Sequence, residues 1–538
     1  MLICSCIRIS SDATDTLIKI QTHPGLRKRS PVFERTGNSM LQYTGTAGKT
    51  KQTVLELLRG EGIFLPADCG GRGTCGKCRV RFLDGVPAPT EEEQKKLTVE
   101  QMQDGVRLAC RACPEGVFTI EYELAEEEIA AESMASEKDS AVKDSGAAGP
   151  VPGQNADAAG QKKVAIDIGT TTIAAALVNV ETGKVMDTVT SINHQRAFGA
   201  DVISRIKASN DGKKEELQQL VCTDLRNLIA QLGEDPDTIP VVIAGNTTMQ
   251  HLLLGLSCET LGVAPFTPVD ISLHEVENKL MLPGISTYVG ADIVAGIVAT
   301  GMDQSDEICM LIDMGTNGEM AIGNKDRILV ASTAAGPAFE GGNISCGVAG
   351  IPGAISRVNI TGGEVQYETI GGKEPVGLCG TGVLEVMYEL LKEEIVDETG
   401  LMDDEYADDG FPLAGSIVFT DRDIREVQLA KSAIRAGAET LIKEFGITYD
   451  KISTLYLAGG FGQKIDLKKA AGIGILPEEL IGRTEAAGNT SLQGAVMAAC
   501  DSSVKERYLH AVSISEEVSL SESTLFNDLY VEHMFFEV

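Results

Sequence analysis

The sequence has no tryptophan, only six histidines and few positively charged residues. Lys and Arg together number 46 against 78 Asp and Glu, so the net charge at pH 7 is −32. Because phosphate backbones are bound by basic surfaces, this charge balance argues against nucleic acid as a partner. The sequence also has no H-E-x-x-H motif, which together with the scarcity of histidine argues against a zinc hydrolase.

Long apolar runs are missing as well, since no stretch approaches the roughly 18 uninterrupted apolar residues that span a bilayer. The opening segment MLICSCIRISSD lacks the basic start and the small-residue cleavage site of a secretory signal. We therefore expect a soluble, cytoplasmic protein with no membrane partner. The 13 cysteines are an odd number and include isolated ones such as Cys222 and Cys500, which argues against a disulfide framework.

The 538 residues exceed what one hydrophobic core usually organises, so we expect several domains. Residues 1–39 form an N-terminal extension without an assigned fold, and residues 40–124 show a compact pattern of strand, helix, loop and strands. Residues 125–161 are rich in Ala, Ser, Gly, Pro and acidic residues and have almost no large apolar side chain. We expect this stretch to be a flexible linker, long enough for the preceding unit to move toward an external acceptor.

An internal repeat fills the remainder of the chain. The segment KVAIDIGTTTIAAALVNVETG reads as strand, tight turn and strand, and CMLIDMGTNGEMAIGNKDR repeats this pattern further along. Helical patterns lie between the strands. We therefore expect two similar α/β halves with mostly buried sheets, over residues 162–303 and 304–538, the second half including a C-terminal tail.

A glycine-rich stretch, ADCGGRGTCGKCRV at residues 67–80, contains Cys69, Cys75 and Cys78, and Cys110 follows after 31 further residues. Four thiolates are the ligand set of a [2Fe–2S] cluster, and glycines let the backbone wrap closely around such a cluster. The pattern therefore predicts that these four cysteines ligate iron.

Two alternatives exist for the cysteines, a zinc site and unrelated core thiols. A zinc site would use Cys110 and Cys113 as a second C-x2-C pair, whereas we interpret Cys113 as a bystander. The C-x5-C-x2-C spacing followed by RLACRA resembles the [2Fe–2S] ferredoxin domain. This resemblance implies a β-grasp ferredoxin-like fold for residues 40–124.

Two aspartates, Asp167 and Asp313, each end an apolar strand and precede a glycine turn. A carboxylate in such a place can hold Mg²⁺ through water, while turn N–H groups and hydroxyls can approach phosphate oxygens. Two such hairpins across a cleft would clamp one nucleotide, although ordinary hairpins are the alternative. The predicted contacts are Asp167, Gly169, Thr170 and Thr171 in the first hairpin and Asp313, Gly315, Thr316 and Asn317 in the second.

A third glycine segment, LAGGFGQ at residues 457–463, follows a strand, and we expect Gly459, Gly460 and Phe461 to line the adenosine. Together the three motifs resemble the phosphate-1, phosphate-2 and adenosine motifs of the acetate and sugar kinase, Hsp70 and actin superfamily. The resemblance implies a duplicated actin-like, RNase H-like α/β ATPase fold that binds Mg-ATP.

Longer stretches over residues 163–500 resemble the reductive activators of corrinoid-dependent enzymes. They include NHQRAFGADVISRI, AGNTTMQHLLLGLSCETLGVAPFTP, YVGADIVAGIVATGM and AAGPAFEGGNISCGVAGIPGAI. The resemblance implies an ATP-hydrolysing iron–sulfur oxidoreductase that passes an electron from a [2Fe–2S] cluster to an inactive Co(II) corrinoid protein of a methyltransferase system, regenerating Co(I). It also implies a low-potential electron donor to the cluster.

Two other functions stay open at this point: a small-molecule kinase of the same superfamily with a regulatory cluster, and a non-hydrolysing iron–sulfur electron carrier. The pair Asp167 and Asp313 weighs against the carrier, and the lack of a recognisable sugar or acyl-acid motif weighs against the kinase. No residue is identified as the catalytic base. Glu340 in AGPAFEGG is a conceivable polar group of the cleft, with a structural turn as an equal alternative. A homodimer is also left open.

Overall fold

The computed structural model describes residues 35–36, 40–47, 51–61, 63–67, 69–123, 160–462 and 464–537. The predicted extension, residues 1–39, lies outside this part of the chain except for 35–36, and the predicted linker, residues 125–161, lies outside it except for 160–161. In the described ranges, no helix is long and apolar enough to cross a membrane.

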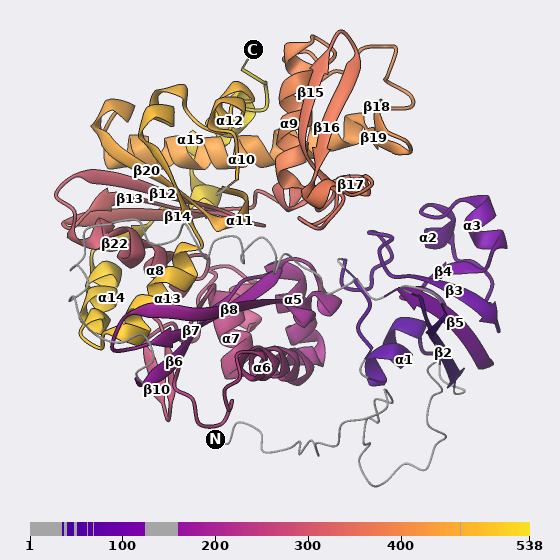
Figure 1. The fold of residues 1–538 in the computed structure, drawn as a ribbon, viewed down its shortest axis with the longest axis horizontal. Helices are drawn as coiled ribbons and strands as arrows, with labels where there is room; N and C mark the ends of the chain where they lie inside the picture. Colours follow the sequence, from indigo (N-terminus) through magenta and orange to yellow (C-terminus); the bar gives the residue numbers. More distant parts are fainter. Residues whose placement is uncertain are drawn as a thin grey trace.

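The N-terminal unit is a five-stranded antiparallel sheet with a helix packed on it (Figure 1). Its strands, in the order β1-β2-β5-β3-β4, are β1 (Arg35–Thr36), β2 (Met40–Ala47), β5 (Gly116–Glu123), β3 (Arg79–Asp84) and β4 (Val106–Leu108). Helix α1 (Val54–Gly60) begins at a capping box in which Thr53 accepts from the Glu56 N–H, and its Val54, Leu55 and Leu58 enter the core. Two short helices, α2 (Glu91–Gln94) and α3 (Val99–Gln103), precede β4.

Two six-stranded sheets form the rest of the framework. The first has the order β10-β11-β9-β6-β7-β8 and is built from β6 (Lys162–Ile168), β7 (Thr172–Asn179), β8 (Lys184–Ile192), β9 (Val241–Gly245), β10 (His274–Val276) and β11 (Lys279–Met281). The second has the order β21-β20-β12-β13-β14-β22 and is built from β12 (Ile308–Met314), β13 (Gly318–Asn324), β14 (Arg327–Thr333), β20 (Ile452–Ala458), β21 (Thr484–Gly488) and β22 (Ser515–Glu517).

The two sheets share one plan. In each, three consecutive strands pair antiparallel, β6-β7-β8 in one and β12-β13-β14 in the other. A later strand then pairs parallel with the first strand of the three, β9 with β6 and β20 with β12. Because parallel strands need a crossover, helices fill the intervening sequence. The predicted duplicated α/β fold is confirmed.

Helices cover both sheets (Figure 1). In the first half they are α5 (Val202–Ala208), α6 (Lys214–Gln231), α7 (Thr247–Leu254) and α8 (Ala291–Thr300). In the second they are α9 (Gly380–Lys392), α10 (Asp421–Phe445), α11 (Gly459–Gly462), α12 (Leu467–Gly472), α13 (Thr490–Cys500), α14 (Val504–Ser513) and α15 (Thr524–Glu532). Two 3-10 turns matter below, η2 (His194–Phe198) and η6 (Ala338–Glu340).

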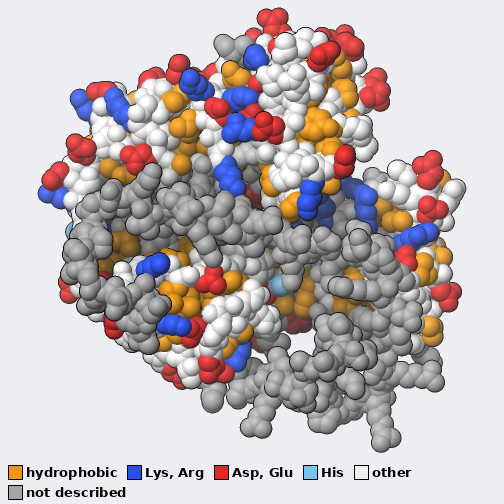
Figure 2. Space-filling model, viewed as in Figure 1, with side chains coloured by type: hydrophobic (Ala, Val, Ile, Leu, Met, Phe, Trp, Pro, Cys, Tyr) orange, Lys and Arg blue, Asp and Glu red, His pale blue; other side chains and the backbone are white. Residues whose placement is uncertain are grey.

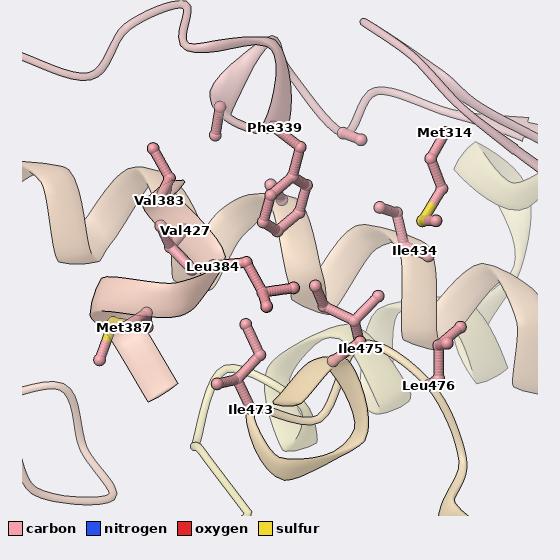
Figure 3. Packing of buried hydrophobic residues seen from close by; sticks show 14 of the residues in the cluster. Met314, Phe339, Val383, Leu384, Met387, Val427, Ile434, Ile473, Ile475 and Leu476 are labelled. Carbon is pink, nitrogen blue, oxygen red and sulfur yellow. The ribbon is translucent and has the colours of Figure 1, made fainter. Parts of the chain in front are cut away.

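The largest core belongs to the second half, where α9, α10 and the 473–476 segment meet (Figure 3). Smaller strands extend this half outward, namely β15 (Ala354–Thr361), β16 (Glu364–Thr369) and β17 (Gly377–Leu378) in one sheet, and β18 (Phe411–Ala414) and β19 (Ile417–Phe419) in another. They pack through buried side chains such as Val358, Ile360 and Phe419.

A second core joins the halves. Helices α13 and α14 come late in the sequence, yet α13 packs on α8 and β6 of the first half and α14 packs on α8. Together they form one apolar cluster that includes Ala165, Leu311 and Ala495. The predicted second half, residues 304–538, thus contributes two helices to the side of the molecule formed by residues 162–303. On the visible described face, acidic side chains are spread between basic ones (Figure 2).

Candidate functional site

The cysteine loop between α1 and β3 has the backbone that its glycines allow. Gly70, Gly71, Gly73 and Gly76 all have positive φ, between 64° and 89°. Side chains make this left-handed region costly, so glycine is the residue that lets the loop curl around a small group. The four glycines thus give this loop a backbone path that other residues would adopt only at a cost.

The four predicted iron ligands lie as two contacting pairs. The thiols of Cys69 and Cys75 hydrogen-bond to one another, and Cys78 and Cys110 form the second pair. The hydrogen bond from Cys75 lowers the pKa of the Cys69 thiol, and the hydrogen bond from Cys110 lowers the pKa of the Cys78 thiol. Cys69 also interacts electrostatically with both members of the second pair, so the pairs are neighbours.

Two adjacent thiol pairs fit a [2Fe–2S] cluster because such a cluster takes four cysteine ligands, two on each iron. Cys113, predicted to be a bystander, belongs to neither pair. The donor set thus suits two irons, with Cys69, Cys75, Cys78 and Cys110 as the residues that would hold them.

The first predicted phosphate hairpin is the turn between β6 and β7. Its Gly169 N–H donates to the Thr172 carbonyl at 3.0 Å, and the Thr170 hydroxyl accepts from the Asn246 amide at 3.1 Å. Asp167, on the strand before the turn, accepts from Asn489 at 2.9 Å and from Ser491 at 2.7 Å. Residues from the start of α13 therefore hold this aspartate in place.

The second predicted hairpin is the turn between β12 and β13, and η6 joins it to the first. Gly315 N–H donates to the Asn317 carbonyl at 3.0 Å. One oxygen of Glu340 accepts from the hydroxyls of Thr171, at 3.2 Å, and Thr316, at 2.9 Å. The structure thus brings the two predicted hairpins together across one carboxylate, and Glu340 is the residue that bridges them.

Five carboxyl groups lie close together around the two hairpins: Asp167, Asp292, Asp313, Glu319 and Glu340. Burial raises the pKa of every one of them. Burial and then the neighbouring Asp292, Asp167 and Glu340 raise the pKa of Asp313 to about 8, while burial and Asp167 raise that of Asp292 to about 7. Keeping all five carboxyl groups ionised so close together costs free energy. A bound divalent cation, or protonation of one of the groups, would lower that cost.

The predicted adenosine segment lies at the end of β20. Gly459 has φ 85°, and a Cβ there would lie 2.8 Å from both the Asp313 carboxylate and the Met314 carbonyl, so this turn touches the second hairpin. Gly460 has open space around its Cα. Phe461 is 7% exposed and stacks on Phe339 with 4.9 Å between ring centroids, so its ring belongs to the core beside η6.

Sequence reasoning missed several groups of this site. Asp292, at the start of α8, and Glu319, two residues after Asn317, were not selected, and Glu340 was named only as a conceivable polar group. Asn489 and Ser491 were also missed. A carboxylate one or two residues after a glycine, as in YVGAD and GTNGE, was the available signal. Asn489 and Ser491 gave no such signal in the sequence, because their partner Asp167 is more than 300 residues away.

Family models match three consecutive parts of the chain. Residues 43–115 match the 2Fe-2S iron-sulfur cluster binding domain, and residues 163–305 match the RACo middle region. Residues 307–538 match the C-terminal domain of RACo, the ASKHA domain. The first match contains all four paired cysteines, and the last contains the second hairpin and Glu340.

Two curated relatives are named for corrinoid activation. The chain is 34% identical to the corrinoid activation enzyme RamQ of Eubacterium limosum over 59% of this chain and 60% of that protein, which is less than two thirds of its length. It is 25% identical to the [Co(II) methylated amine-specific corrinoid protein] reductase of Methanosarcina barkeri over 68% of this chain and 76% of that protein.

A solved structure extends the likeness to nearly the whole chain. The reductive activator for corrinoid, iron-sulfur protein superposes with a TM-score of 0.66 at 30% sequence identity, covering 91% of this chain and 96% of that one. The resemblance noted in the sequence is thereby confirmed, and the chain belongs to the family of reductive activators of corrinoid proteins.

Proposed function

We propose that this protein is an ATP-dependent reductive activator, which passes one electron from a [2Fe–2S] cluster to a Co(II) corrinoid protein of a methyltransferase system and so regenerates Co(I). The observation that carries the proposal is the presence in one chain of two thiol pairs and of two phosphate hairpins joined by Glu340. A low-potential donor supplies the electron to the cluster, and ATP is hydrolysed to ADP and phosphate.

The cysteine loop performs the redox part. Cys69, Cys75, Cys78 and Cys110 hold the cluster, which when bound supplies one electron at a time. The positive-φ glycines keep side chains away from it and let N–H groups of the loop turn inward. All 11 cysteines of the described ranges are free thiols, which suits the reducing conditions of the cytoplasm, where we place the protein.

The two hairpins perform the nucleotide part. We assign Gly169, Thr170 and Thr171 to one side of the phosphates and Gly315, Thr316 and Asn317 to the other. We place Gly459, Gly460 and the backbone of Phe461 beside the adenosine, because the Phe461 ring is in the core. ATP brings further negative charge to five crowded carboxyl groups, so a divalent cation is needed to offset the repulsion. We assign Mg²⁺ to this role, with Asp167 and Asp313 as the aspartates nearest the hairpins.

Glu340 is our candidate for orienting the attacking water. It already accepts from a threonine of each hairpin, so it lies where both hairpins would present the phosphates. Burial raises its pKa, which moves a carboxylate toward the range in which it can accept a proton from water. Asp313 is not our candidate for this step, because we assign it to Mg²⁺.

Coupling to ATP has an energetic reason. For one electron about 59 mV corresponds to about 1.4 kcal/mol, so an acceptor a few hundred millivolts below the donor is out of reach without a second energy source. Hydrolysis at the hairpins supplies that source. A kinase would not need the cysteine loop, and a simple electron carrier would not need the bridged hairpins.

The test is anaerobic Co(I) formation. The holoprotein is mixed with a chemical reductant and a Co(II) corrinoid methyltransferase component, and Co(I) absorbance is followed with and without Mg-ATP. We expect Co(I) to accumulate only with Mg-ATP, and to be lost in Asp313→Asn. The matched control is Asp306→Asn, an exposed aspartate of the same half that pairs with Lys325.

Two outcomes would contradict the proposal. If ATP is consumed without reduction of cobalt in several corrinoid components, the protein is better explained as a phosphoryl-transfer enzyme. If cobalt is reduced equally well without ATP, the hairpins have no part in electron transfer.

A further inference from the structure

The N-terminal unit is not isolated from the first half of the ATPase fold, since helix α1 contacts the turn η2. The Arg59 guanidinium donates to the Ala197 carbonyl and lies 4.4 Å above the Phe198 ring. From the segment after α1, Phe64 packs against the apolar core of the first half. Figure 1 shows the N-terminal unit beside the part of the first half that carries α5.

The cysteine loop itself reaches the same turn. Gly70, which directly follows the iron ligand Cys69, has φ 64°, and a Cβ placed there would lie 3.0 Å from the Phe198 carbonyl oxygen. This is tighter than ordinary van der Waals contact, so a side chain at position 70 would push the loop away from η2. The loop that holds the cluster therefore lies directly on the backbone of Phe198.

The turn η2 and its two flanking residues are bonded to the first phosphate hairpin. Before the turn, the Asn193 side chain donates to the Gly169 carbonyl at 2.9 Å, and its backbone N–H donates to the Thr171 carbonyl at 2.9 Å. After the turn, the Gly199 carbonyl accepts from Arg205 at 2.9 Å. Residues 193–199 are thus bonded to the hairpin directly at Asn193 and through Arg205 at Gly199.

Arg205 makes the second of these links rigid. The same guanidinium donates to the Thr170 carbonyl at 2.5 Å, in the middle of the hairpin. The side chain is fully buried, and this burial lowers its pKa to about 9, while the carboxylates of Asp201 and Asp224 favour the charged form. A shift of the hairpin would have to move Arg205 and, with it, Gly199.

We propose that residues 193–199 are the docking surface for the N-terminal, cluster-bearing unit. We further propose that binding of a nucleotide at the first hairpin changes the free energy of docking, and that docking changes the free energy of nucleotide binding. The inference rests on the proposed nucleotide site. Its partner is a segment of the same chain, α1 with the cysteine loop. By thermodynamic linkage, a nucleotide that alters docking must have its own affinity altered by docking by the same factor.

Hydrogen exchange on the full holoprotein tests whether nucleotide binding changes docking. Peptides from residues 54–78 are followed with and without Mg²⁺ and a non-hydrolysable ATP analogue. We expect the analogue to change exchange in these peptides as well as around residues 163–175, and the effect on 54–78 to vanish in Arg59→Ala. The control is Arg81→Ala, which removes an exposed arginine from β3, away from η2.

A double-mutant cycle tests whether docking changes the affinity for nucleotide. The Kd of the analogue is measured for wild type, Arg59→Ala, Phe198→Leu and the double variant, with iron content as a check that the cluster unit is intact. Leucine is chosen because Phe198 is buried and an alanine would leave a cavity. We expect each single change to alter Kd about fivefold or more, and the double variant to differ little from either.

The outcomes separate the two proposals. If the analogue binds and protects residues 163–175 but leaves residues 54–78 and the Kd of Arg59→Ala unchanged, the docking inference is wrong and the proposed function stands. If wild type binds no nucleotide, both are overturned.

Discussion

At the residue scale, Glu340 should separate nucleotide binding from hydrolysis. Glu340→Gln keeps an acceptor oxygen for Thr171 and Thr316 but removes the negative charge that accepts a proton. We expect the rate of phosphate release to fall by about 10²- to 10⁴-fold, with ATP affinity little changed. Steady-state phosphate release and equilibrium binding measure the two effects.

The matched control for Glu340 is Glu364→Gln, an exposed glutamate at the start of β16. It should leave both quantities unchanged. A phosphate-release rate for Glu340→Gln within a few-fold of wild type would mean that this carboxylate only joins the hairpins and takes no part in hydrolysis.

Cysteine substitutions provide a second prediction at this scale. Cys75→Ser removes one member of a thiol pair and replaces a soft thiolate by a hydroxyl, a poor ligand for iron in a cluster. We expect most of the bound iron and its visible absorbance to be lost. Cys113→Ser is the control and should retain both, since Cys113 is in neither pair. Equal loss in the two variants would contradict the assignment.

The sequence predicted some residues of the candidate site and could not predict others. The cysteine loop was predictable because ligand spacing and glycine content are local, and the positive φ angles of Gly70, Gly71, Gly73 and Gly76 agree with it. Glu340 could not be assigned, because its role depends on two threonines that approach it from different hairpins. Nothing in AGPAFEGG alone distinguishes a bridging carboxylate from a turn residue.

At the scale of elements, the start of α11, which directly follows β20, should tolerate a methyl group at Gly460 and not at Gly459. Gly459→Ala places a Cβ in the left-handed region, which costs about 1–2 kcal/mol, and against the Asp313 carboxylate. We expect ATP affinity to fall by about tenfold or more. Gly460→Ala should change it little, since nothing lies within 4 Å of the added atom.

Isothermal titration of both glycine variants measures this difference, with thermal unfolding as a check on the fold. Similar affinities in the two variants would show that the start of α11 is not part of the nucleotide site.

The repeated strands were predictable because each copy is a local pattern of an apolar strand, a glycine turn and another strand. The third strand and the parallel partner then follow in the same order in both halves. The placement of α13 was not predictable. It is an apolar helix like several others, and only the fold reveals that it packs on α8 and β6.

At the scale of the whole molecule, electron delivery should depend on the freedom of the cluster-bearing unit. Replacing residues 125–159, whose composition predicts a flexible tether, by a short rigid helical segment should leave ATP hydrolysis intact and slow Co(I) formation. Phosphate release and Co(I) absorbance are measured on the same sample. A flexible Gly/Ser replacement of the original length is the control and should support both activities.

Unchanged Co(I) formation with the rigid segment would mean that the cluster reaches its acceptor without moving away from η2. In that case the corrinoid protein would have to approach the docked unit directly.

The packing of α13 on α8 has a consequence for synthesis of the protein. Helix α8 ends at Thr300, and α13 begins at Thr490, 190 residues later. At about 5–20 residues per second, a ribosome needs about 10–40 s to produce the covering helix. During that time the apolar face of α8 lacks its partner. The nascent chain therefore offers a binding site to chaperones, and a truncation before residue 490 should yield an aggregating first half.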